Sequence, residues 1–523
     1  MWLSILAVLS SVHLEADVPV AGGDYVDVPF EVPAGTKEIR IAHADNDDFV
    51  ILDWGVWSPE GFRGWGGGNL EDAVIGVDQS SRSYLPGPIT PGTWTVVIGK
   101  AMLGADGGHY TIDVTCSDTE TLPVKPKAEF SPVVLSTERR WYKGDFHVHS
   151  EESGDATATF DQIATLAAQR GLDFVNISDH NTDSQLSLIA AAQPGYSVLF
   201  LRGAEITTYA GHGNAVGLPT YIDHRIGYQG RTIGDVIADV RAQGALFIVN
   251  HPVLDLGDNC IGCAWTHDPT PWDQVSGIEV ITGRWDVVER LFVPRAIEMW
   301  DGLLDQGYRI APIGGSDDHR AGMGTGFTDT PVGSPTTLVL ADELSEAAIM
   351  DGIRKGRTIV NLRGPDDPAI DVHVRTADGG LAEIGDDVDG IARMQMPITI
   401  TGGAGNFVEL WRDGERIEQE PITSDDFSIE LEDEPGPTDH RYRVELITDA
   451  NQRIVVTGHF YVHGIAAADG CGCGSNRGSD GRELLFPCVF GLAIACRRFA
   501  RRARPGRGTR RSRSAREAAT SSR

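Results

Sequence analysis

Histidine and carboxylate side chains close a series of short apolar segments in the middle of the sequence. These segments run into HVHS, SDHN, GAEIT, VNHP and GSDDH, which contain His147, His149, Asp179, His180, Glu205, His251, Asp317 and His319. Side chains of a strand alternate between its faces, so we expect His147 and His149 to share one face. Imidazoles combined with carboxylates are ligands for zinc, manganese and iron. The pattern predicts a site for several divalent ions.

One HxH pair by itself is weak support for a metal site, because surface or structurally satisfied histidine pairs are more common. The stronger support is repetition, since metal-binding residue types stand at the ends of five predicted strands. In a barrel of alternating strands and helices, these ends meet at one mouth, where active sites are built. The repeated pattern therefore favours a metal site over histidines with only a structural role.

The elements that position these residues are predicted between residues 141 and 363. Apolar runs at 144–149, 174–178 and 246–250 are typical of strands, and 159–170 and 232–243 are typical of helices. Repeated strand–helix units predict an α/β fold with a parallel sheet or barrel.

Two further domains are predicted around this region. Residues 17–116 and 364–465 contain short β-type runs separated by Gly, Pro, Asp and Asn, which indicates an N-terminal and a C-terminal β-sandwich. Residues 117–140 contain three prolines and scattered charges, so they predict a linker.

The ordered set HxH, SDH, Glu, His and D-x-H resembles the PHP (polymerase and histidinol phosphatase) superfamily of metallohydrolases over about residues 141–363. Within it, KGDFHVHS, GAEITT, GHGNAVG and the added β-domain are most similar to the CehA/McbA family. The resemblance implies a distorted (β/α)7 PHP barrel flanked by the two β-sandwich domains.

The resemblance also implies roles for single residues. One ion would be held by His147, His149, Glu205 and Asp317, a second by His180 and His319, and a third by Glu205 and His251. Asp155 stands where some relatives place a further histidine ligand, so it is expected to give the second ion an oxygen. The cofactor predicted is two or three ions of zinc, manganese or iron, among which this mixture of ligands does not select.

Asp179 and His212 are the candidate catalytic side chains. Asp179 is expected to orient His180 or to move protons, and its alternative role is to cap the end of a strand. His212 follows Glu205 closely and is either a substrate contact or a further metal ligand. Arg231 and Arg320 are near the motifs in sequence, but arginines there are more often surface residues.

Divalent ions lower the pKa of a bound water and polarise a substrate oxygen, so the predicted activity is hydrolysis of a small-molecule ester. The superfamily resemblance favours a phosphoester. The CehA/McbA resemblance makes a carboxylic ester, carbamate or amide the alternative substrate. A surface protein that binds without catalysis is a third hypothesis.

The net charge of −31, from 75 Asp and Glu against 44 Lys and Arg, argues against general nucleic-acid binding. The cysteine number of seven is odd, and several lie near the C-terminus, so a disulfide-rich scaffold is excluded. The spacing Cys260-x-x-Cys263 is compatible with a zinc ligand pair, a redox pair or a small disulfide, and export would favour the disulfide.

Both ends of the chain suggest export. Residues 1–16 resemble a secretory signal peptide, and the alternative is a buried first strand. Residues 466–523 combine a Cys-Gly-Cys motif, a short apolar run and an arginine-rich end, which resembles a MYXO-CTERM sorting segment; the alternative is a disordered basic tail. We therefore expect a secreted or surface protein, with the tail as a means of attachment to a membrane or the cell surface.

Overall fold

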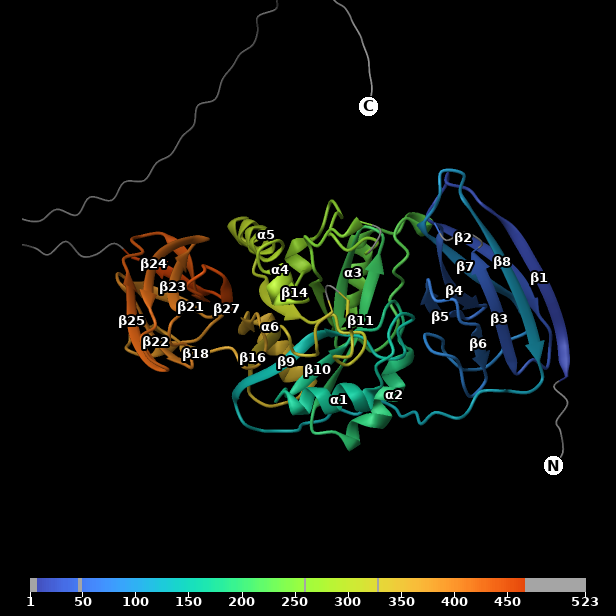
Figure 1. The fold of residues 1–523 in the computed structure, drawn as a ribbon, viewed down its shortest axis with the longest axis horizontal. Helices are drawn as coiled ribbons and strands as arrows, with labels where there is room; N and C mark the ends of the chain where they lie inside the picture. Colours follow the sequence, from blue (N-terminus) through green and yellow to red (C-terminus); the bar gives the residue numbers. More distant parts are fainter. Residues whose placement is uncertain (1–6, 46–48, 258–259, 327–328, 466–523) are drawn as a thin grey trace, which may run out of the picture. The chain divides into compact units, whose positions relative to one another are not determined.

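The structure is a computed structural model that describes residues 7–45, 49–257, 260–326 and 329–465. It is a mixed α/β protein rich in sheet, with strands in all three of the predicted regions (Figure 1). The MYXO-CTERM-like segment, at 466–523, lies outside the described residues. Within the described part of the chain, no helix is long and apolar enough to cross a membrane.

Two antiparallel sheets of four strands form the first part of the chain. One has the order β1-β8-β3-β6, with β1 Val8–Val18, β8 Gly108–Ser117, β3 Glu38–Asp45 and β6 Ala73–Gly76. The other has the order β2-β7-β4-β5, with β2 Tyr25–Val32, β7 Gly92–Met102, β4 Ile51–Ser58 and β5 Gly61–Gly67. Side chains of both sheets are buried in one hydrophobic cluster that contains Trp54 and Trp94. The shared cluster is the arrangement expected when two sheets pack face to face.

Strand β1 occupies most of the predicted signal segment. It pairs antiparallel with β8, from Val8 opposite Ser117 to Val18 opposite Gly108, and most of its side chains are exposed. The alternative of a first strand is thus what residues 8–16 form, although at a sheet edge and not buried. Residues 1–6 lie outside the described part, and cleavage of a signal peptide stays a prediction.

The middle of the chain contains alternating strands and helices. The strands are β9 Arg140–Val148, β10 Phe174–Ile177, β11 Leu199–Thr208, β12 Gly211–Val216, β13 Leu246–Val249, β14 Gly277–Thr282, β15 Ala311–Gly315, β16 Thr336–Ala341 and β17 Thr358–Asn361. The helices are α1 Phe160–Gln169, α2 Ser184–Ala192, α3 Ile233–Ala242, α4 Trp285–Val288, α5 Val293–Asp305 and α6 Glu346–Arg354. Capping boxes begin two of them, at Thr159 for α1 and Thr232 for α3.

Strands β9 to β15 lie side by side in chain order, and an isolated parallel bridge between Val148 and Asp318 brings the end of β15 back to β9. The strands are not all parallel, because β12 runs antiparallel to both β11 and β13. Only two residues separate β11 from β12, and a parallel crossover needs a dozen or more. The expected (β/α)7 barrel is therefore not confirmed in that form, and the sheet is mixed.

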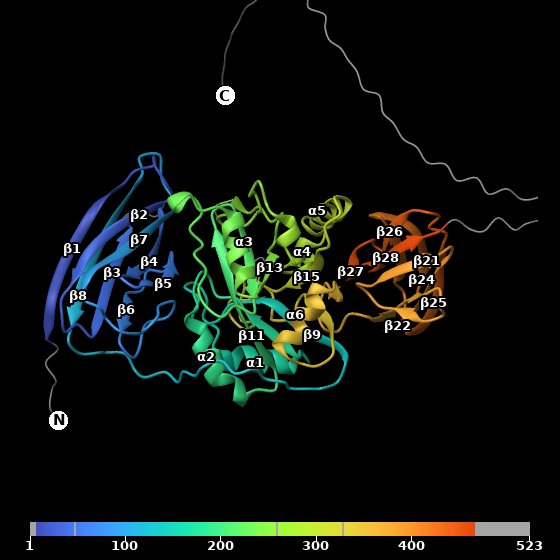
Figure 2. The same cartoon turned by 180° about the vertical axis from the view of Figure 1, so that it is seen from behind.

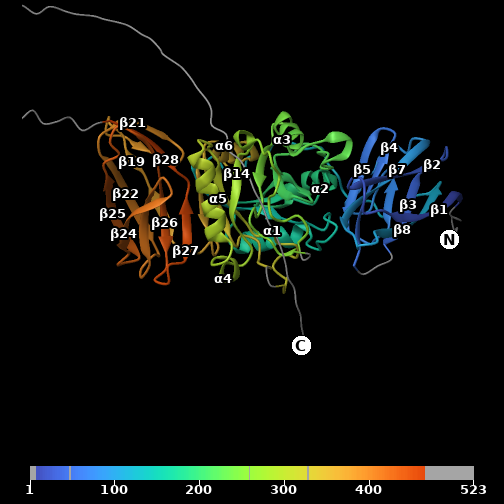
Figure 3. The same ribbon diagram turned by 90° about the horizontal axis from the view of Figure 1, so that it is seen from above.

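Helices cover this sheet through three clusters of buried side chains. Phe160 of α1 and Ile189 of α2 belong to one cluster, and these two helices lie beside each other in Figures 1 and 2. Val236 of α3 and Trp300 of α5 belong to a second, and α5 runs along β14 in Figure 3. Met350 of α6 belongs to the third, together with side chains of β9, β11 and β13. The strand ends that carry the predicted ligands thus rest on a packed scaffold.

The last part of the chain is again β. Its strands are β18 Ala369–Val372, β19 Val374–Arg375, β20 Leu381–Ala382, β21 Asp387–Ile391, β22 Met394–Thr401, β23 Phe407–Arg412, β24 Glu415–Pro421, β25 Asp426–Asp433, β26 Asp439–Ile447, β27 Arg453–Thr457 and β28 Phe460–Gly464. Strand β27 pairs with β17, so hydrogen bonding continues from the middle sheet into the C-terminal strands. The predicted division at 363/364 does not interrupt this sheet, and the other domain boundaries stay predictions.

Candidate metal centre

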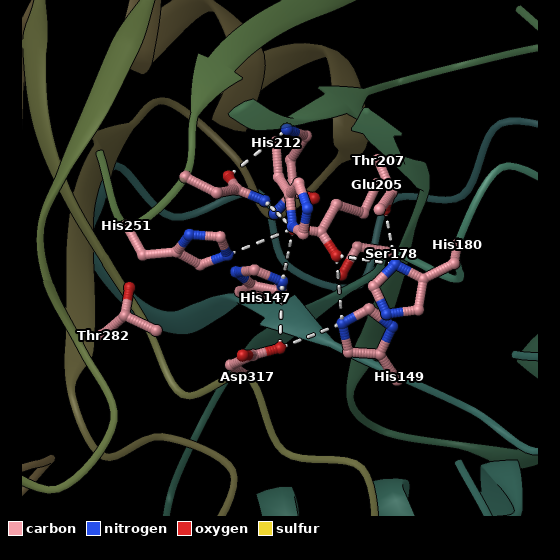
Figure 4. A network of polar contacts seen from close by, with 12 residues as sticks. His147, His149, Ser178, His180, Glu205, Thr207, His212, His251, Thr282 and Asp317 are labelled. Carbon is pink, nitrogen blue, oxygen red and sulfur yellow. Dashed lines mark hydrogen bonds and ion pairs between the residues drawn. The ribbon is translucent and has the colours of Figure 1, made fainter. Parts of the chain in front are cut away.

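The predicted ligands gather around Glu205 at one end of the middle sheet (Figure 4). Glu205 lies in β11 and His147 in β9, while His180, His251 and Asp317 stand two or three residues after the ends of β10, β13 and β15. His212 lies in β12, which is beside β11 because of the tight connection between them. The fold therefore places side chains from separate strands in one cluster.

The carboxylate of Glu205 faces five histidines and is 1% exposed. Its Oε1 lies 3.3 Å from Nε2 of His147, 3.4 Å from Nδ1 of His212 and 3.4 Å from Nε2 of His251. Its Oε2 lies 2.9 Å from Nδ1 of His180 and 3.6 Å from Nε2 of His149. A carboxylate between so many ring nitrogens can bridge neighbouring cations.

Asp317 completes the first candidate metal position. Its Oδ1 lies 3.1 Å from Nε2 of His147 and 3.1 Å from Nε2 of His149. The structure thus brings together His147, His149, Glu205 and Asp317, the set expected for one ion. Ligand atoms of His147, His149 and Asp317 lie within 4.8 Å of one another.

Asp155 lies between the two histidines of the second candidate position. Its Oδ2 is 3.3 Å from Nε2 of His180 and 3.3 Å from Nε2 of His319. The ring of His149 stacks on both, with centroids 4.4 Å from His180 and 4.1 Å from His319. This loop aspartate is therefore within reach of an ion held by His180 and His319.

His251 and His212 define the third candidate position, where Nε2 of His251 and Nδ1 of His212 face the same Oε1 of Glu205. The other ring nitrogen of each histidine faces a backbone carbonyl: that of His212 is 3.1 Å from the oxygen of Ile261, and that of His251 is 3.1 Å from the oxygen of Cys263. A carbonyl only accepts hydrogen bonds, so these outer nitrogens donate. The inner nitrogens then direct lone pairs at a carboxylate oxygen.

The outer nitrogens of two more histidines are held in the same way. Nδ1 of His147 donates to Oε1 of Glu279 at 3.0 Å, and Nδ1 of His319 donates to the carbonyl of Asp317 at 2.8 Å. Hydrogen bonds of this kind fix the ring and the tautomer of metal-binding histidines. The four rings are thus oriented with their inner nitrogens toward carboxylates.

Buried atoms without a partner show that divalent ions fit these residues. Nε2 of His147 is buried and has no hydrogen-bond partner among the described residues, although carboxylate oxygens of Glu205 and Asp317 lie near it. Burial lowers the pKa of His147, but Asp317, Glu205 and Glu279 raise it well above its usual value. Burial raises the pKa of Glu205, while His147 and His180 hold it well below the usual range. The cluster thus favours positive charge between its nitrogens and oxygens, which divalent ions would supply.

Two candidate ligands have unusual backbone conformations. His251 has φ of 27° and Asp317 has φ of 59°, in the region that favours glycine. Such conformations cost about 1–3 kcal/mol each and cluster at functional sites. The packing around the strand ends therefore holds these two side chains in place against local strain.

Three buried side chains that support the site were not among the predicted residues. Glu279 in β14 accepts from His147 and from the backbone N–H of His251. Asn250 donates to Oε1 of Glu205 at 2.8 Å, and Asp145 accepts from the backbone N–H groups of His147 and Ser316. A charged residue inside the apolar run GIEVIT was the available signal for Glu279.

Asp179 is bonded to the loop after His149. Its carboxylate accepts from the backbone N–H and from the hydroxyl of Ser150, both at 2.6 Å. Burial raises the pKa of Asp179 to about 7. Within the described residues, no hydrogen bond joins its carboxylate to the ring of His180, and the roles of Asp179 in moving protons or in capping a strand end stay predictions.

A cavity of about 670 Å³ opens beside the cluster. Glu205, His212, His251, Asp317 and His319 line it on the metal side, and Asp53, Trp65 and residues 66–69 line it from the N-terminal sheets. Among its described lining residues none is a lysine or an arginine. Arg320, 3.9 Å from Asp329, and Arg231, bonded to Asp239, are not in the lining.

Cys260 and Ile261 also line the cavity, and Cys260 is joined to Cys263 by a disulfide. Of the three alternatives for this pair, the structure therefore contains the disulfide. Cys116, by contrast, is a buried free cysteine in β8.

The sequence matches no protein-family model and no curated protein. Among solved structures, the chain is similar to a two-domain protein from Bacteroides vulgatus containing a predicted PHP-like metal-dependent phosphoesterase. The identity is 18%, the TM-score 0.36, and the match covers 65% of this chain and 100% of that chain. An amidohydrolase from Chromobacterium violaceum has 15% identity and a TM-score of 0.24 over 36% and 91% of the two chains. A protein from Bifidobacterium adolescentis described as a metal-dependent phosphoesterase has 17% identity and a TM-score of 0.26 over 36% and 92%.

Proposed function

We propose that the protein is a metal-dependent hydrolase whose active site is the cluster around Glu205. The observation that carries the proposal is the orientation of four histidines, His147, His212, His251 and His319. Each has one ring nitrogen donating to a fixed oxygen and the other facing a carboxylate. When the rings are neutral, as metal binding requires, this arrangement directs their lone pairs at shared positions beside a cavity large enough for a small molecule.

Bound divalent ions would supply a water of lowered pKa and would polarise the substrate oxygen. The residues of the chain determine where that chemistry takes place. Glu205 keeps the candidate positions close together, and Glu279 holds His147 in one tautomer. His212 lies on the cavity wall, where it is placed to contact the substrate or to complete the third position.

Within this class, we propose a small-molecule phosphoester as the first candidate substrate. Adjacent ions on one cavity wall can contact both the attacking and the leaving oxygen of a phosphoryl group. Four carboxylates near the histidines, from Asp155, Glu205, Glu279 and Asp317, leave a cluster of three divalent ions with net positive charge. Such a cluster attracts a phosphate without a neighbouring lysine or arginine.

A carboxylic ester, carbamate or amide is the second candidate. The observation in its favour is the lack of lysine and arginine in the described cavity lining, together with the acidic Asp53 and the aromatic Trp65. An uncharged substrate needs no cationic side chain. The side chains of the lining therefore favour the uncharged substrate, whereas the positive charge of bound ions would favour the phosphoester.

The test compares hydrolysis of p-nitrophenyl phosphate, bis-p-nitrophenyl phosphate and p-nitrophenyl acetate by the full chain loaded with manganese or zinc. We expect Glu205→Gln to lower the rate at least about 100-fold, because the neutral amide no longer bridges cations. Glu409→Gln is the matched control, since Glu409 is an equally buried glutamate in β23. Activity on acetate alone would select the second candidate, and metal binding without any hydrolysis would favour a non-catalytic binding protein.

Export and attachment through the C-terminal segment are further proposals that rest on the sequence of the two ends. Their support is the apolar run within residues 1–16 and the arrangement of cysteines, apolar residues and arginines in 466–523. We also propose a small-molecule ester as the partner, and the cavity of about 670 Å³ supports a ligand of that size.

A further inference from the structure

The loop 260–263 contacts the candidate metal centre through its backbone. The carbonyl of Ile261 accepts from Nε2 of His212, and the carbonyl of Cys263 accepts from Nδ1 of His251, both at 3.1 Å. These are the two histidines of the third candidate position. Two backbone carbonyls of one short loop therefore set the orientation of both rings.

The loop is itself held in a narrow space. Cys263 is 1% exposed and bonded to Cys260 through the disulfide. Gly262 has φ of 73°, and a Cβ atom there would lie 2.3 Å from the carbonyl oxygen of Thr208. The loop thus packs directly on the end of β11, the strand that carries Glu205.

The direction of the two hydrogen bonds has an electrostatic consequence. With their outer nitrogens donating to carbonyls, His212 and His251 both direct lone pairs at Oε1 of Glu205, 3.4 Å away. Lone pairs facing a carboxylate repel it unless a proton or a metal ion lies between them. The loop therefore selects the ring tautomers that bind a cation at this position.

We propose that the disulfide loop Cys260–Cys263 is a positioning element of the metal centre. The disulfide keeps the carbonyls of Ile261 and Cys263 against His212 and His251, so that the third position binds an ion tightly. This inference rests on the proposed function, because it requires that the cluster binds divalent ions. The binding of the ion at the third position would then depend on the disulfide, which is not itself a ligand.

The test measures zinc ions per chain and zinc affinity by competition with a chelator, independently of activity. We expect Cys260→Ser combined with Cys263→Ser to lower the affinity for one zinc ion by roughly 10–100-fold and to leave the affinities for the other ions unchanged. Gly262→Ala displaces the loop while both cysteines are retained, so it should lower the affinity for the same ion. Circular dichroism of each variant reports whether the fold is intact.

Two variants serve as controls. Gly171→Ala also places a side chain at positive φ, at the end of α1, but its Cβ meets no atom of the described residues within 4 Å, so the zinc affinities should equal those of the wild type. Cys116→Ser removes the buried free cysteine without touching the loop. Wild-type affinities in both controls would link the loss to the contact between the loop and the histidines.

Three results would overturn the inference in different ways. Unchanged affinities in the double serine variant and in Gly262→Ala would exclude positioning by the loop while leaving the hydrolase proposal intact. If the wild type binds no zinc, the metal basis of both proposals is wrong. If a phosphine-reduced wild type shows a thiolate-to-metal absorption band with cobalt, then Cys263 is a ligand, since its sulfur lies within 4.8 Å of ligand atoms of His212 and His251.

Discussion

At the scale of single residues, the site depends on pairs in which one side chain fixes another. Glu279 is the clearest case, because it accepts from Nδ1 of His147 and also from the backbone N–H of His251. It contacts two candidate ligands, His147 and His251, but it is not among the described residues that line the cavity. A residue of this kind acts on metal binding through the ligands that it orients.

We expect Glu279→Gln to reduce the zinc affinity of the protein by about 10–100-fold with little change in fold. The amide oxygen still accepts from His147, but it carries no charge to strengthen the basicity of the ring. Chelator competition measures the affinity, and thermal unfolding of the metal-free protein checks the fold. An unchanged affinity with a lowered unfolding temperature would assign Glu279 a purely structural role.

At the scale of elements, a buried ion cluster joins α5 to the C-terminal strands. Arg443 of β26 is fully buried, and its guanidinium donates to both carboxylate oxygens of Asp301 in α5, at 2.6 and 3.0 Å. It also donates to Glu445 at 2.8 Å. Removing one member of a buried pair leaves the remaining charges without compensation.

We therefore expect Arg443→Met to lower the free energy of unfolding by about 3–5 kcal/mol. Arg375→Met is the matched control, because the pair of Arg375 with Glu430 is exposed and such pairs contribute about 0–1 kcal/mol. Urea unfolding followed by tryptophan fluorescence gives both values. Equal small losses in the two variants would contradict the assignment of this cluster as the connection between α5 and β26.

Strand β3 provides a prediction for the effect of pH. His43 is buried against Trp54, with ring centroids 4.4 Å apart, and burial lowers its pKa from 6.5 to about 4. The unfolded chain therefore takes up a proton at higher pH than the folded chain. The stability of the N-terminal sheets should be full above pH 6.5 and fall toward pH 4, by up to about 3 kcal/mol from this residue.

The measurement is urea unfolding at pH 7 and pH 5 for the wild type and for His43→Gln. Glutamine at position 43 does not titrate in this range, so the loss of stability between the two pH values should be smaller in the variant than in the wild type. A loss as large as in the wild type would show that other groups cause the pH dependence.

At the scale of the whole molecule, two features are visible only in the tertiary structure. The pairing of β27 with β17 extends the sheet of the middle region into the C-terminal strands. The cavity beside the metal side of the middle sheet is also lined by Asp53 and Trp65 of the N-terminal sheets. Sequence segments predicted as separate domains therefore share a sheet and a cavity.

The N-terminus provides a test at this scale. If residues 1–16 are removed on export as predicted, the mature chain begins at Asp17 and lacks most of β1. Because most side chains of β1 are exposed and β8 keeps β3 as its other neighbour, we expect the shortened protein to stay folded. The intact mass of the exported protein measures the cleavage, and circular dichroism of the shortened protein checks its fold. An exported chain that retains residues 1–16 would contradict the signal-peptide prediction.

The sequence by itself determined the types of the chemical groups and their places on the elements. His147, Glu205, His251 and Asp317 stand at the ends of apolar runs, so local periodicity was enough to predict that they meet. The mixed α/β class followed from the same alternation. Such features depend on neighbours within a few residues.

Only the tertiary structure decided which atoms face each other. His147 is separated from Glu279 by 132 residues, and the carbonyls that orient His212 and His251 belong to backbone that carries no sequence signal. The reversal of β12 and the pairing of β27 with β17 also arise from contacts between distant segments. Burial makes these contacts specific, because a polar group removed from water is costly until another group or an ion satisfies it.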